Sequence, residues 1–363
     1  MRARAICVAA LGVLLAGCAG MGGGAPARAD QQPARQVKDW PISTRYHLDL
    51  WLHGYALLQA DTTLVPYFKR GYVDQLTALK NRANVFTELD RYRTQLREGL
   101  SSNPDLIGGQ FLPLYFDSWD EMLSAIDTYL KSDGKPTTTQ DPQVQQVIAI
   151  VGASFPSAAD RAWLRTFTNG LSDENTKFFQ SYWNQQQRER SPAMVALDSL
   201  WKKVYLPKFH AYLNNTRQNE GEMLVSLPLD GEGRTITNSP QSNLVAVTYP
   251  ERAEDAMDAI YVFTHEVVGT LANQVIADNT TPTEKRDGTA ARYASPAAVR
   301  GGVIVLQKIA PELVKGYEAY YLRSANVSFR AGTEEATMAR VFPLPQAMLY
   351  GMQRQLEIVF GGI

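Results

Sequence analysis

Residues 262–271, VFTHEVVGTL, lie in the last third of this 363-residue chain and decide how that third is expected to fold. Helical spacing over residues 253–277 gathers one wide apolar face, formed by Met257, Ile260, Thr264, Val267, Val268, Leu271 and Val275. His265 falls on the rim of this face, beside Tyr261 and Ala272. The pattern predicts a mostly buried helix, and a single rim histidine in such a helix is more often a hydrogen-bonded structural residue than a metal ligand.

Gly269 stands in the middle of this expected helix. Glycine in a helix interior costs about 1 kcal/mol relative to alanine. Its presence therefore indicates close backbone packing, a kink or the approach of a ligand.

Three short strands are expected just before this helix, between residues 222 and 250. They are MLVSLPL at 223–229, RTITN at 234–238 and NLVAVTY at 243–249. The Gly-rich run DGEG at 230–233 is typical of a hairpin turn between the first two. Pro228 cannot donate a backbone hydrogen bond, so we expect the first strand at the sheet edge.

This order of elements resembles the zincin metallopeptidases, and the gluzincin branch in particular. In that family a small sheet with an exposed edge strand precedes a His-Glu-x-x-His helix, and a later helix supplies a glutamate ligand. The resemblance covers roughly residues 220–325 and rests on His265-Glu266-Val-Val-Gly269. It implies a zinc site in which His265 ligates the metal, Glu266 activates water, and Glu318 or Glu312 is a further ligand.

The chain departs from the family at Gly269, where the second histidine belongs. Histidines four residues apart share one helix face and can reach one tetrahedral ion, whereas glycine offers no ligand atom. Asp278 cannot substitute, since thirteen residues along a helix rise about 20 Å and turn about 220°. His47, His53 or His210 could arrive through the fold. The motif therefore leaves open an active zinc site, a metal-free zincin-like scaffold and an unrelated helical domain.

The first forty residues have the pattern of a bacterial lipoprotein. Two arginines, a twelve-residue apolar stretch and LAGC at 15–18 resemble a signal peptide with a lipobox. Twelve apolar residues cover about 18 Å as a helix, too little for a span of the roughly 30 Å hydrocarbon core. We expect removal of residues 1–17, lipidation of Cys18, and a flexible tether at 18–39 rich in Gly, Ala, Pro and Gln.

Charge and cysteine content exclude several other classes. The chain carries 36 basic and 37 acidic residues and no basic run, which argues against a nucleic-acid partner. Loss of Arg2 and Arg4 with the signal leaves 34 against 37, or −3, so acyl chains rather than charge would anchor the protein. Apart from Cys7 and Cys18 the chain has no cysteine, which excludes disulfides and thiolate zinc sites from the folded part.

Successive helices are expected over residues 40–221, followed by the small sheet and the zincin-like helices over 222–363, the two forming one compact domain. Helix starts are indicated at Ser118–Glu121, Asp141–Pro142, Ser157–Asp160 and Ser191–Pro192. One long helix is expected over 72–99 and another over 192–214, kinked at Pro207. The predicted fold is mainly α with a small antiparallel β-sheet (α+β).

Other candidate residues have ordinary explanations. His47 and His53 are six positions apart, about 240° around a helix, and so are expected to be structural. Tyr317, Tyr320 and Tyr321 could place a phenol near a reacting group, yet tyrosines at this spacing usually pack helices together. Arg300 could bind a carboxylate, although a surface arginine is the simpler expectation. The sequence has no phosphate-binding loop, nucleophile elbow or calcium loop.

These features predict a lipid-anchored protein of the bacterial cell envelope. Ala19 follows Cys18, where an aspartate could favour the inner membrane, so we expect the outer membrane, facing the periplasm. The expected role is non-catalytic binding of a peptide or another envelope component, in a cleft between the sheet edge and the 253–277 helix. A zinc peptidase using His265 and Glu266 is one alternative, and a structural or assembly lipoprotein is the other. The binding protein is expected to carry no cofactor, whereas the peptidase would carry zinc.

Overall fold

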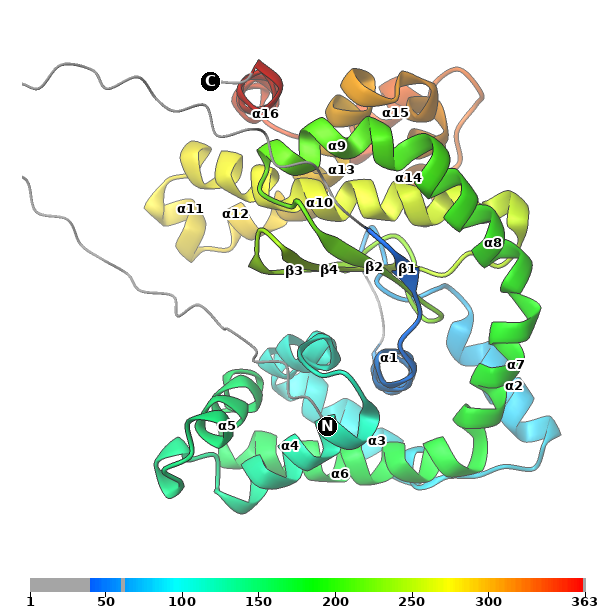
Figure 1. Ribbon diagram of the computed structural model, residues 1–363, viewed down its shortest axis with the longest axis vertical. Helices are drawn as coiled ribbons and strands as arrows, with labels where there is room; N and C mark the ends of the chain where they lie inside the picture. Colours follow the sequence, from blue (N-terminus) through cyan, green and yellow to red (C-terminus); the bar gives the residue numbers. More distant parts are fainter. Residues whose placement is uncertain (1–39, 60–62, 362–363) are drawn as a thin grey trace, which may run out of the picture.

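Helix starts in the N-terminal half follow the capping residues of the sequence. The computed structural model describes residues 40–59 and 63–361 (Figure 1), so Cys18, the signal segment and the tether lie outside the described residues. α5 (Pro142–Ser154) is capped by Asp141, and α6 (Ala158–Glu174) by a reciprocal box of Ser157 and Asp160. At α4 (Trp119–Lys131), Ser118 accepts from the Glu121 N–H. These predicted starts are confirmed.

The long helix expected over residues 72–99 is instead two helices, α2 (Tyr72–Arg82) and α3 (Glu88–Ser102). Asn84 between them adopts a left-handed conformation (φ 51°), which ends α2. Thr87 then begins α3 through a capping box with Asp90. The apolar spacing continues across the break because both helices bury leucines in the same core, and this is why the sequence predicted one helix.

A curved run of helix carries the chain from the lower to the upper half of the molecule (Figure 1). It consists of α6, α7 (Gln180–Glu189), α8 (Ser191–Leu200) and α9 (Leu206–Asn215), with π-helical turns at Asn175–Phe179 and Trp201–Tyr205. The second π turn directly precedes Pro207, whose ring and missing N–H disturb a regular α-helix. The predicted irregularity at Pro207 is therefore a widened turn.

The sheet has four strands, β1 (Ile42–Ser43), β2 (Gly221–Ser226), β3 (Arg234–Ser239) and β4 (Ser242–Thr248), in the order β1-β2-β4-β3. β2 is parallel to both β1 and β4, and only β3 runs antiparallel, beside β4. The expected fold class, mainly α with a small sheet, is confirmed, but the sheet is mixed rather than antiparallel.

Two details of the predicted sheet were wrong. β2 lies inside the sheet rather than at its edge, because it ends at Ser226, before Pro228 could interrupt the ladder. The glycine-rich run 230–233 is no hairpin turn between β2 and β3, since β4 separates these strands. The hairpin instead joins β3 to β4, where Ser239 pairs with Ser242.

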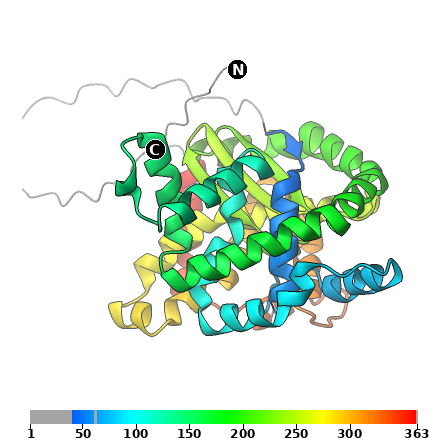
Figure 2. The same cartoon turned by 90° about the horizontal axis from the view of Figure 1, so that it is seen from below.

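Two helices cover the faces of the sheet, α10 (Ala256–Asn279) on one and α1 (Tyr46–Leu58) on the other (Figure 1). α1 passes through the middle of the molecule, as Figure 2 shows from below. Its buried Asp49 accepts hydrogen bonds from Ser226 Oγ (2.5 Å), Leu227 N (3.0 Å) and Trp183 Nε1 (2.8 Å). Asp49 thereby ties α1 to β2 and to α7.

The remaining helices are α11 (Pro282–Arg286), α12 (Thr289–Arg292), α13 (Ala294–Ile309), α14 (Val314–Ser324), α15 (Glu334–Val341) and α16 (Gln346–Gly361). Of these, α13, α14 and α16 pack against α10, α15 packs against α14, and α12 lies between α11 and α13. Trp40, Trp201 and Phe263 form an edge-to-face aromatic cluster that joins the start of the described chain, the curved run and α10. Among the described residues, every helix is too short or too polar to span a bilayer.

Candidate functional site

His265 lies on α10, the helix that covers one face of the sheet, and its side chain is 3% exposed. Its ring stacks on Tyr321 of α14, with centroids 5.3 Å apart and planes inclined by 28°. This packing fixes the ring plane and turns Nε2 toward the turn before β3. The adjacent Glu266 points to the same place, since its carboxylate accepts from Gly233 N at 2.9 Å.

Glu232 occupies that turn, between two glycines. Its Oε2 lies 2.9 Å from His265 Nε2, and its Oε1 accepts from Ser295 Oγ at 2.6 Å. A side chain at Gly233 would collide with the carbonyl oxygen of Ala246, so glycine is required for the turn to sit against β4. Tyr321 also donates to the carbonyl oxygen of Gly231 (3.1 Å). The turn is thus held by α10, α13 and α14 together.

Glu232, His265 and Glu266 form what we call the Glu–His–Glu cluster, whose ligand atoms lie within 4.8 Å of one another. One imidazole nitrogen and two carboxylate oxygens are ligands that could hold a divalent ion such as zinc. The sequence alone had predicted one imidazole ligand, His265, and a carboxylate from a later helix. Glu232 is the residue of the candidate site that the sequence did not predict, although an acid between two glycines next to the expected strands was a usable signal.

The electrostatics of the cluster separate its two carboxylates. Burial opposes ionisation of Glu232, but the charge of His265 and the hydrogen bonds from His265 and Ser295 outweigh it and lower the pKa of Glu232. Burial also opposes the charged form of His265, yet its carboxylate neighbours raise the pKa of its ring. Burial dominates at Glu266 and raises its pKa to about 7. Glu232 and His265 therefore form an ion pair beside a carboxyl group able to exchange a proton near neutrality.

The cluster forms part of the wall of a cleft of about 600 Å³. The lining includes the apolar groups of Leu64, Val65, Tyr67, Ala294, Pro296 and Ala298, together with Arg234, Gly269, Asn273 and Arg292. Apart from its chain neighbours and the adjacent helix backbone, a β-carbon built on Gly269 would meet no described atom within 4 Å. The position at which the zincin motif has its second histidine is therefore open space facing the cleft.

The other predicted metal ligands lie elsewhere. Glu312 forms an ion pair with Lys208 at the surface. Glu318 is buried on α14, where desolvation and the charges of Glu335 and Glu334 raise the pKa of its carboxyl group. Among the described residues, the group close enough to share an ion includes neither of them. The structure brings together only His265 and Glu266 of the four predicted residues.

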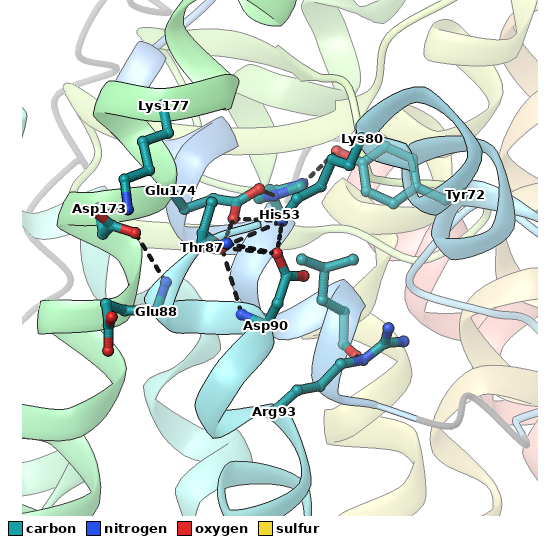
Figure 3. A network of polar contacts seen from close by, with 11 residues as sticks. His53, Tyr72, Lys80, Thr87, Glu88, Asp90, Arg93, Asp173, Glu174 and Lys177 are labelled. Atoms are coloured by element: carbon teal, nitrogen blue, oxygen red, sulfur yellow. Dashed lines mark hydrogen bonds and ion pairs between the residues drawn. The ribbon is translucent and has the colours of Figure 1, made fainter. Parts of the chain in front are cut away.

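The remaining histidines on α1 have structural contacts, as expected. His47 Nε2 lies 2.9 Å from the carbonyl oxygen of Phe116. His53 belongs to a buried polar network that joins α1, α2, α3 and α6 (Figure 3). There Glu174 accepts from His53 Nε2 (3.1 Å), Lys80 Nζ (2.7 Å) and Thr87 Oγ1 (2.5 Å). Within the described chain, no second histidine joins the Glu–His–Glu cluster.

The tyrosines of α14 hold the turn rather than facing a reacting group. Tyr320 OH lies 3.4 Å from Asp230 Oδ1, and Tyr321 reaches Gly231. Arg300 is half-buried on α13, near Glu318 and Glu335, rather than at the cluster. The packing expectation for the tyrosines is confirmed.

The order of contacts limits the chemistry of the site. Ser295 bonds to the carboxylate of Glu232, which in turn meets His265, so the ring does not contact the hydroxyl and cannot take its proton. A serine nucleophile requires the ring beside the hydroxyl. The arrangement suits proton exchange at Glu266, ligation of a cation, or binding of a polar group in the cleft.

Comparison with protein-family models, with curated proteins and with solved structures finds no match. The zincin-like scaffold and the lipid anchor therefore remain predictions.

Proposed function

We propose that this protein binds an extended peptide segment or peptide-like envelope component in the cleft beside the Glu–His–Glu cluster. The observation that carries the proposal is an edge strand next to a mostly apolar cleft. In the described sheet β3 pairs only with β4, and its first residue, Arg234, lines the cleft. An exposed strand edge binds a further strand through main-chain hydrogen bonds, and neighbouring pockets select its side chains.

A bulky side chain at Gly269 tests the proposal, because a Trp there would fill the cleft. Random dodecapeptides displayed on phage would be selected on immobilised residues 37–363, and one enriched peptide would be synthesised for fluorescence anisotropy. We expect Gly269→Trp to weaken binding at least tenfold. Thr270→Trp is the matched control, since Thr270 is exposed, lies about 100° further round the helix and does not line the cleft. Failure to enrich any peptide, or equal binding by both variants, would contradict the proposal.

A second candidate is zinc-dependent peptide hydrolysis, favoured by the spacing of the cluster. In this proposal Glu232 and His265 would hold a zinc ion, whose chemistry there would be the activation of water, and Glu266 would serve as the general base. With Glu266 as base only two protein ligands remain, fewer than catalytic zinc sites usually have. For this reason binding without catalysis stays our first proposal.

Metal analysis separates the two candidates. Purified residues 37–363 would be dialysed against zinc and assayed for bound metal and for cleavage of casein. The hydrolase candidate expects one zinc per chain, lost in His265→Ala and Glu232→Gln but kept in His210→Ala. Absence of bound zinc in the native protein would remove this candidate and leave peptide binding.

We further propose that the protein is anchored in the bacterial outer membrane, facing the periplasm, through lipidated Cys18. The proposal rests on the lipobox-like LAGC and the tether that follows it. Cys18→Ser should release the protein from the membrane fraction and abolish incorporation of labelled palmitate. A variant that remains in the membrane fraction would contradict the anchor.

A further inference from the structure

Gly269 has no packing reason to be glycine. Several glycines inside helices have one: a β-carbon would lie 2.7 Å from Phe167 at Gly54 and 2.6 Å from Val268 at Gly301, and would collide with Tyr317 at Gly302. Gly108 and Gly361 also have open space, but neither lines the cleft. At Gly269 a β-carbon would have no described atom within 4 Å beyond its chain neighbours and the adjacent helix backbone. Glycine nevertheless costs a helix about 1 kcal/mol relative to alanine.

The empty space beside Gly269 belongs to the cleft. A group that comes into contact with the helix backbone at Gly269 is therefore an occupant of the cleft rather than a part of the described fold. Close approach of a backbone is one of the recurrent reasons for glycine in a regular element. This explains the residue without requiring a kink, because α10 continues through Gly269 to Asn279.

The cleft presents two exposed arginines that make no direct ion pair within the described part of the chain. Arg234 at the start of β3 and Arg292 at the end of α12 both line it, and both are exposed. Neither forms an ion pair with any residue in 40–59 or 63–361, and Arg234 instead lies 6.0 Å from the centre of the Phe111 ring. Glu232 is bound by His265 and Ser295. The charge of Arg234 acts on Glu266 and that of Arg292 on Asp287, but no direct hydrogen bond joins either pair, so both guanidinium groups keep donors for a ligand.

We propose that the occupant of the cleft is an acidic peptide that passes over Gly269 and places carboxylates on Arg234 and Arg292. The proposal rests on peptide binding as the function of the cleft and specifies its ligand class. The planar guanidinium of arginine binds carboxylates through paired hydrogen bonds, and exposed unpaired arginines beside an apolar cleft select for negative charge.

Three fluorescein-labelled decapeptides test the ligand class by anisotropy on residues 37–363. The first alternates Val and Glu and ends in an amide, the second replaces Glu with Gln, and the third is the Gln peptide with a free carboxyl terminus. We expect the Glu peptide to bind at least tenfold more tightly than the amidated Gln peptide. If only the free-terminus peptide matches it, the carboxylate comes from a chain end, which also supports the proposal.

Variants assign the contacts. Arg234→Gln with Arg292→Gln should remove the preference for carboxylates, whereas Arg354→Gln on α16 is the control. Gly269→Ala should weaken binding of the Glu peptide several-fold while raising the melting temperature. Equal affinity for Glu and Gln peptides, or unchanged binding in Gly269→Ala, would overturn the inference and leave peptide binding standing. No binding of any peptide, with no enrichment in the phage selection, would overturn peptide binding itself.

Discussion

Glu232 and His265 show how one contact defines the properties of the candidate site. Their side chains meet 2.9 Å apart although 33 positions separate them in the chain. Each changes the proton affinity of the other, so the protonation of the ring reports directly on whether the cluster forms.

We predict that Glu232→Gln lowers the pKa of His265. The variant removes the negative charge that raises this pKa, while burial, which lowers it, remains. NMR titration of the imidazole resonances, assigned with His265→Ala, measures the change. Glu222→Gln is the control, since Glu222 is paired with Arg45 on a different part of the sheet. A His265 pKa that is the same in Glu232→Gln and in the native chain would show that this carboxylate is not its partner.

Glu266 gives a prediction for stability. Its pKa rises from 4.5 to about 7 in the folded chain, so between these values the folded state holds a proton that the unfolded state has lost. Stability from this group is therefore present below pH 4.5 and is lost as pH rises through 7. Glu266→Gln keeps an oxygen that accepts the hydrogen bond from Gly233 N, and it removes this loss of stability at high pH.

We expect Glu266→Gln to raise the free energy of unfolding at pH 8 by up to about 3 kcal/mol relative to the native chain, and much less at pH 4.5. Urea unfolding at the two pH values measures the difference. An equal effect of the substitution at both values would argue against a raised pKa at Glu266.

At the scale of the element, α10 combines a buried packing face with one open position. Its apolar residues and Thr264 pack against the sheet and α13, as the helical periodicity predicted. Position 269 faces the cleft and lies four residues, about one helical turn, after His265. A second histidine at 269 would therefore lie beside the first. The helix is therefore built so that an imidazole at 269 has room.

We predict that Gly269→His strengthens zinc binding at least tenfold, because two imidazoles one turn apart can reach one tetrahedral ion. Isothermal titration with zinc compares this variant with the native chain. Thr270→His adds the same group on an exposed face and is expected to leave the affinity unchanged. Equal zinc affinity in Gly269→His and the native chain would show that position 269 does not face a metal site.

At the scale of the whole molecule, the buried network of Figure 3 joins helices that are distant in the sequence. Burial opposes ionisation of Glu174, but hydrogen bonds and charges from His53 and Lys80 outweigh it and lower its pKa to about 2. This carboxylate contributes stability above pH 4.5 that is lost as pH falls toward 2.

Glu174→Gln should lower the free energy of unfolding at pH 7 by about 3 kcal/mol, because it removes the buried carboxylate that binds His53 and leaves Lys80 with Asp90 alone. The difference from the native chain should shrink on acidification below pH 4.5. Denaturant unfolding over this range measures both effects. Asp127→Asn breaks an exposed pair with Lys131 and should change stability little. A Glu174→Gln variant as stable as the Asp127→Asn variant at pH 7 would contradict the role of the network.

The sequence by itself determined the features that depend on nearby residues. Asp141 and the Ser157–Asp160 box begin helices through contacts within four positions, and the buried face of α10 follows from helical periodicity. The low cysteine content and the missing ligand at Gly269 were equally visible. The caps, the buried face and the missing ligand follow from spacing along one element, and the cysteine content follows from composition, so a sequence states all of them directly.

Only the tertiary structure decided how the elements meet. Strand order places β4 between β2 and β3, and thereby makes β3 the edge beside the cleft. The same folding brings Glu232 to His265 and takes Glu312 to Lys208. Such contacts depend on the packing of elements far apart in the chain, and spacing within any one of them carries no information about that packing.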